Sequence, residues 1–220
     1  MTKNTPMTHR ARLEKCLSGE KTDRTPVALW RHFPVADQDP VQFARSTLEF
    51  QESFNFDFVK ITPASSYCLV DWGVQTEWRG NPEGTRDFTR RVVRTPEDWT
   101  KLQLLDPLRG NLASTLDAIR LIRKNLPADT PIIQTIFNPL SQAKNLAGQD
   151  VMLDHLRNYP EYLKIGLQTI LQSTLDFIES LKEVGVDGIF YAVQHAQPRF
   201  LSREEFDSFS RLDDLQLLKA

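Results

Sequence analysis

Polar and titratable side chains follow four short apolar stretches of the sequence, at the point where each stretch ends. The first stretch, Val27-Ala-Leu-Trp30, runs directly into Arg31 and His32. The corresponding groups at the three later stretches are Lys60 and Thr62, then Asn138, then Tyr191, Gln194 and His195. If each stretch is a strand of one parallel sheet, the carboxyl ends of the strands bring these side chains to a shared edge, where α/β proteins build their binding sites.

These residue types indicate an anionic small-molecule ligand. A buried arginine or lysine needs a partner, and the four stretches offer few acids. Arginine presents paired donors to a carboxylate, and imidazole titrates near neutral pH. We therefore predict His32 and His195 as catalytic proton donors. The predicted substrate-binding residues are Arg31, Lys60, Thr62, Asn138, Tyr191 and Gln194.

A simpler interpretation is that these side chains are satisfied within the fold. An isolated arginine or histidine at a strand end is often a solvated loop residue. Lys60 could also pair with Asp57 or Asp71. The sequence leaves both interpretations open, and it predicts no metal ligands among these residues.

The elements that would position these groups alternate between strands and helices. Strands are predicted at Val27–Arg31, 58–61, 131–136 and 187–193. The predicted helices are 8–18, a helix capped by Asp39, 110–126, 138–148, 150–157, 159–184, a helix capped by Ser202, and 212–219. This alternation favours a parallel sheet between helices, as a (β/α) barrel or a doubly wound sheet. Neither glycine-rich phosphate motif is present, which favours the barrel.

Residues 72–94 interrupt this alternation. Turn signals at Trp72-Gly73, Gly80-Asn-Pro82 and Glu83-Gly84 separate two extended stretches, 74–78 and 88–93. We predict a β-hairpin outside the main sheet. From these elements we predict a single α/β domain over residues 1–220, as a barrel or a doubly wound sheet.

The composition excludes several classes of function. The 220 residues carry 27 Lys+Arg and 29 Asp+Glu, which gives a net charge of −2. The cations are scattered, so nucleic acid is not an expected partner. No apolar run reaches the roughly 20 residues that span a bilayer, and the first residues do not resemble a signal peptide. Two distant cysteines, Cys16 and Cys68, indicate reduced packing residues, and we expect a cytoplasmic protein.

Four segments together resemble the uroporphyrinogen decarboxylase family. They are V-A-L-W-R-H-F-P, F-D-F-V-K-I-T-P, V-D-W-G, and G-V-D-G-I-F-Y followed by L-S-R-E-E-F, in the family's order. The resemblance runs over nearly the whole chain and implies a (β/α)8 TIM barrel. Because four strands cannot close a barrel of eight, the predicted fold is the N-terminal half of that barrel with a β-hairpin excursion. Arg31 matches an arginine that ends the first strand in the decarboxylases. Where those enzymes have an aspartate after the second strand, this sequence has K-I-T-P.

Three candidate functions remain open, of which the resemblance implies the first two. The first is a carboxy-lyase of porphyrin biosynthesis that acts, without a cofactor, on a tetrapyrrole or another carboxylate-bearing substrate. The second is a corrinoid-dependent methyltransferase, whose zinc ligands, an H-x-C motif and a later cysteine, belong to the second half of the family's fold. The third is a non-catalytic half-barrel that binds a ligand or assembles with another chain. We expect either a missing C-terminal half or a homodimer.

Overall fold

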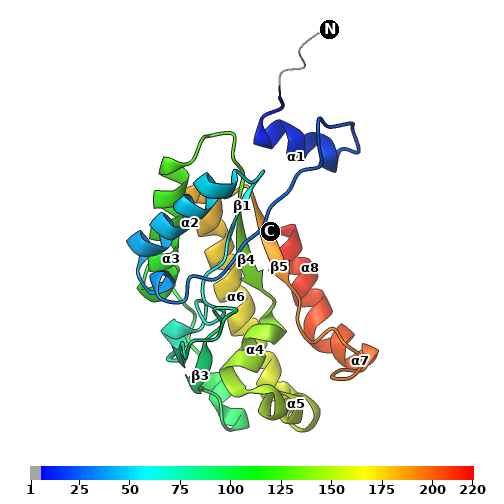
Figure 1. Ribbon diagram of the computed structural model, residues 1–220. Coiled ribbons are helices and arrows are strands. Elements are labelled where there is room, and N and C mark those ends of the chain that lie inside the picture. Colours follow the sequence, from blue (N-terminus) through cyan, green and yellow to red (C-terminus); the bar gives the residue numbers. More distant parts are fainter. Residues whose placement is uncertain (1–5) are drawn as a thin grey trace.

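The computed structural model describes residues 6–220, and Figure 1 shows its ribbon. Three strands, β1 (Val59–Ile61), β4 (Ile132–Phe137) and β5 (Gly188–Ala192), form a parallel sheet in the order β1-β4-β5. Lys60 lies beside Ile133. Helices connect the strands, because parallel strands require a long crossover. The predicted α/β fold with a parallel sheet is confirmed.

The helices begin and end at residues whose chemistry sets these limits. At the start of α2 (Pro40–Phe54), Asp39 accepts a hydrogen bond of 2.9 Å from the backbone N–H of Gln42. Asn138 caps α4 (Pro139–Ala147) in the same way, and Gly185, with φ of +85°, ends α6 (Pro160–Val184). The other α-helices of residues 6–220 are α1 (His9–Leu17), α3 (Gly110–Asn125), α5 (Gln149–Asn158), α7 (Arg203–Phe206) and α8 (Leu212–Lys219).

The helices and the N-terminal segment lie on different faces of the sheet. In Figure 1, α2 and α3 lie to one side of the strands, α6 passes behind them, and α8 lies along β5. Fully buried aliphatic side chains fill the space between strands and helices, among them Ile119, Ile122, Ile132, Ile136, Leu163 and Ile170. The chain between α1 and α2 crosses the opposite face, which we call the front, and residues 25–34 are named the crossing segment. Within residues 6–220, no helix has the length and apolar character needed to cross a membrane.

The first predicted strand, Val27–Arg31, is wrong. The segment has no regular secondary structure and does not join the hydrogen-bond ladder of the sheet. Only its start is tied to the sheet, where the Val27 carbonyl accepts a hydrogen bond from the backbone N–H of Asp57. Beyond that point it contacts β1 and β5 through the Trp30 side chain. Leu29 is 63% exposed and Trp30 is 44% exposed, so this apolar run covers the open front of the sheet instead of entering a core.

The predicted hairpin is present and shorter than expected. β2 (Gln75–Glu77) pairs antiparallel with β3 (Asp87–Arg90), outside the main sheet. A Cβ atom added to Gly84 would lie 2.6 Å from the Cβ atom of His32, and Arg86 Nη1 donates to the Pro34 carbonyl at 2.6 Å. Gly84 also has φ of +74°, which side-chain-bearing residues rarely adopt. The hairpin therefore packs directly against the end of the crossing segment.

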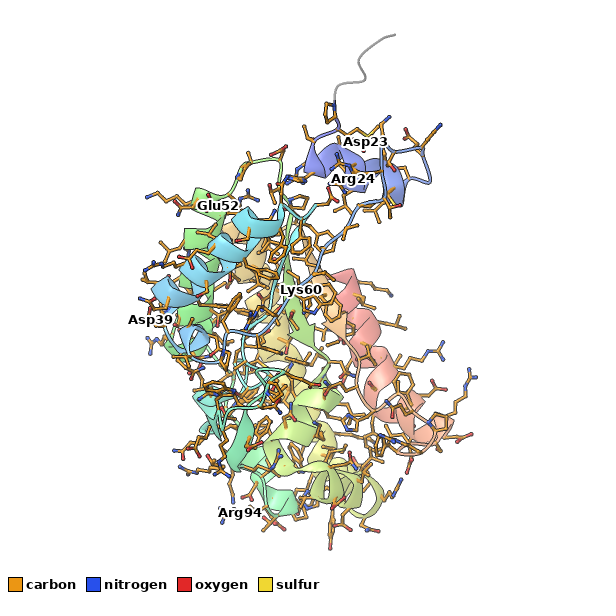
Figure 2. All side chains as sticks on the ribbon, viewed as in Figure 1. Asp23, Arg24, Asp39, Glu52, Lys60 and Arg94 are labelled. Atoms are coloured by element: carbon orange, nitrogen blue, oxygen red, sulfur yellow. The ribbon has the colours of Figure 1, made fainter. Side chains whose placement is uncertain are left out.

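A buried carboxylate fastens α1 to the N-terminal end of the sheet. The side chain of Asp57, just before β1, is fully buried and accepts hydrogen bonds from Arg12, Arg24, His9 and the Val27 N–H. Asp23 accepts from the other side of the Arg12 guanidinium at 2.7 Å. Burial opposes ionisation of Asp57, but these donors outweigh it and hold the Asp57 pKa well below its usual range. Figure 2 shows Asp23 and Arg24 beside α1.

Candidate functional site

Lys60 is the centre of the candidate site. It stands in β1, is 7% exposed, and lies where the crossing segment passes the strands (Figure 2). Its Nζ atom lies 4.6 Å from the ring centroid of Trp30 and 4.3 Å from that of Phe190. It donates a hydrogen bond to Thr62 Oγ1 at 3.3 Å. Two aromatic rings and one hydroxyl therefore surround the ammonium group. Aromatic rings attract a cation through the negative charge on their faces.

Within residues 6–220, no carboxylate forms an ion pair with this ammonium group. Of the two partners considered from the sequence, Asp57 is bound by arginines, and Asp71 accepts from the backbone N–H of Asn111 at the start of α3. Burial lowers the pKa of Lys60 to about 8. The lysine is therefore a partly desolvated cation at neutral pH, and such a group gains most from binding an anion.

Arg31 and His32 follow Trp30 on the crossing segment. Arg31 is exposed; its Nε donates to the His32 carbonyl at 3.4 Å, and its guanidinium lies 5.5 Å from the Phe33 ring. His32 is half-buried, and its Nδ1 has no hydrogen-bond partner among the described residues. Burial lowers the pKa of His32, against the opposing charge of Asp37. Burial therefore favours the neutral imidazole, which is the form that can accept a proton.

Asp37 is a titratable residue of this region that the sequence-based set omits. It lies in the turn Ala36–Gln38, where Oδ1 accepts a hydrogen bond of 2.6 Å from Gln38 and Oδ2 is buried without a partner in the described structure. Burial raises the pKa of Asp37, while the charges of Arg86 and His32 oppose that rise. An aspartate between two turns is typical of a loop, so no local signal marks it. The packing of the hairpin against the crossing segment brings Arg86 and His32 close to Asp37.

Asn138, Tyr191 and Gln194 are not brought together with Lys60. The side-chain amide of Asn138 donates to the Ser210 hydroxyl at 2.9 Å while its oxygen caps α4. The Tyr191 hydroxyl donates to Asp214 on α8 at 2.7 Å, so it faces the helices and not the front. Gln194 is exposed beyond the end of β5. Their role in ligand binding stays a prediction.

His195 also lies beyond β5, in a strained and buried position. It is 6% exposed, its φ is +71°, and its Nδ1 has no partner among residues 6–220. Burial lowers its pKa, and the charge of Lys144 lowers it further. The predicted residues thus form two groups. Arg31, His32, Lys60 and Thr62 lie along the crossing segment and β1; Asn138, Tyr191, Gln194 and His195 lie on β5 or beyond the ends of β4 and β5.

The described residues do not fit a metal ion. Among residues 6–220, no three His, Cys, Asp or Glu side chains form a group that could hold one. Burial raises the pKa of Cys68 to about 12, so it remains a thiol, whereas zinc binds the thiolate. Cys16 is exposed on α1, at the other end of the sheet. The zinc ion implied by the methyltransferase resemblance therefore has no ligand set in this part of the chain.

Comparisons with known proteins connect the chain to one family. The family model for uroporphyrinogen decarboxylase (URO-D) matches residues 8–212. Two curated relatives, both named methylcobamide:CoM methyltransferase MtaA and both from Methanosarcina barkeri, are 22% identical over 222 residues. These matches cover 92% of this chain and 63% of each relative, so the chain spans less than two thirds of the relatives' length. A solved methyltransferase from Methanosarcina mazei has the same fold, with a TM-score of 0.83 at 20% identity over 97% of this chain and 67% of that chain.

Proposed function

This chain belongs to the uroporphyrinogen decarboxylase family, and we propose that it carries the acceptor-binding site of a methyltransferase. The names of the matched relatives favour methyl transfer over decarboxylation, the function placed first from the sequence. The proposed acceptor is a small anionic thiol, such as the coenzyme M of those names. The three-stranded sheet is, in this proposal, part of a (β/α)8 barrel. Decarboxylation of a tetrapyrrole stays an untested prediction.

The observation that carries this proposal is the Lys60 ammonium group, which has no carboxylate partner in the part of the chain that the structure describes. An ammonium has three N–H donors, and Thr62 accepts from one of them. The rings of Trp30 and Phe190 occupy its sides without offering a conventional acceptor. Trp30 is 44% exposed and Phe190 is 37% exposed, so a ligand can reach these rings from the front. A negatively charged acceptor at that place supplies the missing charge partner.

Two further residues of the crossing segment support binding of the same acceptor. Arg31 is exposed and carries a second positive charge without an ion-pair partner among the described residues. Both cations stabilise a thiolate over a thiol, because a nearby positive charge favours the ionised form. His32, with its unpartnered Nδ1, accepts the thiol proton in this proposal. A corrinoid supplies the methyl group when it is bound, and we assign no step to a metal ion.

Calorimetric titration of the chain with coenzyme M tests the binding site. Lys60→Met keeps an unbranched side chain and removes the charge, so we expect at least a tenfold weaker affinity, or about 1.4 kcal/mol. Lys164→Met is the matched control, because Lys164 also lies over a ring, 5.8 Å from that of Phe209, but is exposed and paired with Glu161. The control should bind as the wild type does. Equal affinity in the wild type and in Lys60→Met would contradict the proposal.

Methyl transfer needs its own measurement. The wild-type chain is mixed with methylcobalamin and coenzyme M, and the absorbance spectrum of the corrinoid is followed with time. Thiol-dependent demethylation that depends on Lys60 supports an acceptor site used in catalysis. Binding of coenzyme M without demethylation favours the third function considered above, a binding role without turnover.

A further inference from the structure

A second group of cations, Arg91, Lys144 and His195, lies beyond the C-terminal ends of the strands. Arg91 directly follows β3, Lys144 is in α4, and His195 follows β5, so three separate elements contribute one residue each. Burial lowers the pKa of Lys144, and the charge of Arg91 lowers it further. Burial and the charge of Lys144 also lower the pKa of His195. Hydrogen bonds place all three residues against the same stretch of α4. Arg91 donates to backbone carbonyls at residues 144 and 145. Gln194, next to His195, donates its backbone N–H to Ser141 Oγ at 3.1 Å, one turn before Lys144.

Arg91 is held in place by contacts that leave most of its donors free. Its Nη1 donates to the Asn145 carbonyl at 2.6 Å and approaches that of Lys144 at 3.4 Å. The guanidinium lies 4.5 Å from the Phe88 ring, and the next residue, Val92, donates its backbone N–H to the Leu146 carbonyl. These bonds use Nη1 alone, so Nε and Nη2 remain able to donate to a planar or tetrahedral oxyanion.

His195 is the second independent sign of a ligand. Only 6% of its surface is exposed, and its Nδ1 has no hydrogen-bond partner among the described residues. Its φ of +71° is unfavourable for a residue with a side chain. The structure thus keeps an imidazole in a strained backbone position with an unsatisfied nitrogen. Such a cost is typical of residues that a binding site requires.

We propose that Arg91, Lys144 and His195 form a second anion site, which binds a phosphate group. Within residues 6–220, no carboxylate pairs with any of the three. The cations of Arg91 and Lys144, with a titratable imidazole beside them, favour a doubly charged oxyanion over a single carboxylate. Arginine offers the paired donors that match phosphate geometry, and lysine adds a compact charge. Lys60 is not a member of this group, so the inference does not rest on the proposed acceptor site.

Titration of the full chain with inorganic phosphate, followed by the ¹⁵N signals of the histidine rings, tests this site. We expect saturable binding that shifts the His195 signals. Lys144→Met should weaken phosphate binding at least tenfold. His195→Asn should weaken it severalfold, and asparagine tolerates positive φ, so this variant keeps the backbone conformation. Lys164→Met serves as the control and should bind phosphate as the wild type does.

Three outcomes would overturn the inference. They are the absence of saturable phosphate binding in the wild type, unchanged affinity in both site variants, and acetate binding as tightly as phosphate. Should Lys144→Met fail to fold in a thermal-unfolding check, His195→Asn decides the outcome alone. A failure here with intact coenzyme M binding, or the reverse, identifies which of the two proposed sites is wrong.

Discussion

Buried charges are paired at the N-terminal end of the sheet and lack a carboxylate partner, among the described residues, on its front and beyond the C-terminal ends of its strands. At the N-terminal end, Asp57 is fully buried, and its carboxylate is paired with two arginines and a backbone N–H of the chain. On the front and beyond the C-terminal ends of the strands, Lys60, Lys144 and His195 are buried or half-buried without a carboxylate partner in the described structure. Figure 2 shows this separation, with Asp23 and Arg24 beside α1 and Lys60 at the strands.

This difference separates structural charges from binding charges. A buried ion pair whose members are all hydrogen-bonded loses much stability when one member is removed. A desolvated cation without a partner destabilises the free protein, and a ligand that supplies the opposite charge recovers that energy. Mutations at the two ends should therefore change the free energy of unfolding in opposite directions.

Asp57→Asn should have the largest effect on stability. The change leaves Arg12 and Arg24 beside a neutral buried amide, and such a loss costs about 3–5 kcal/mol. Urea denaturation measures it. Asp39→Asn is the matched control, because asparagine caps a helix as well as aspartate does, and its stability should stay close to that of the wild type. Similar losses of unfolding free energy in both variants would contradict a special role of Asp57 and the arginines around it.

The same cluster predicts the response to acid. The pKa of Asp57 is held below its ordinary value of 3.8, so its contribution to stability is fully present above that pH. It is lost as the pH falls further, toward the lower pKa of the folded state. Unfolding curves between pH 5 and pH 2, a range of roughly three units around that value, should show a steeper fall for the wild type than for Asp57→Asn. An equal pH dependence of stability in the wild type and in Asp57→Asn would contradict the lowered pKa of Asp57.

Lys60→Met should change stability less and in the other direction. Removing a buried cation without a partner should raise the free energy of unfolding by about 1 kcal/mol at neutral pH. In the wild type the folded protein releases this proton near pH 8, below the ordinary value of 10.5. Wild-type stability should therefore rise between these two pH values, and Lys60→Met should lack that rise. A destabilised Lys60→Met would mean that the ammonium is already satisfied.

Thr62→Val should have the smallest effect. It removes the acceptor of the 3.3 Å hydrogen bond from Lys60 and keeps the shape of the side chain. A bond of this length is weak, so the expected loss of coenzyme M affinity is about threefold or less. Calorimetry under the conditions used for Lys60→Met measures it. A loss as large as that of Lys60→Met would place the anion on Thr62 and not on the ammonium.

The sequence predicts those features that depend on neighbours in the chain. The caps at Asp39 and Ser202 are found where expected, because each depends on residues within one turn. The strand predicted at 27–31 fails because a strand also needs a ladder partner. The segment has a backbone hydrogen bond to Asp57, before β1, and contacts β1 itself through the Trp30 side chain. Apolar composition alone does not distinguish these two cases.

The candidate site was predictable only in part for the same reason. Lys60 follows from a cation at the end of an apolar run, but its ring partners come from residues 30 and 190, far apart in the sequence. Asp37, Arg91 and Lys144 carry no local motif, and they gain their environment from the hairpin and α4. Tyr191 fits the pattern of a strand-end group, yet it faces α8, where its hydroxyl donates a hydrogen bond to Asp214.

The most direct test of the account is the pKa of Lys60, measured by NMR of ¹³C-labelled lysine ε-carbons. The signal is assigned by its absence in Lys60→Met. The account predicts a pKa of about 8 in the free protein and a rise when coenzyme M binds, because an anion favours the charged form. A pKa near the ordinary 10.5, unchanged by coenzyme M, would show that the ammonium is neither desolvated nor a binding group, and would contradict the account.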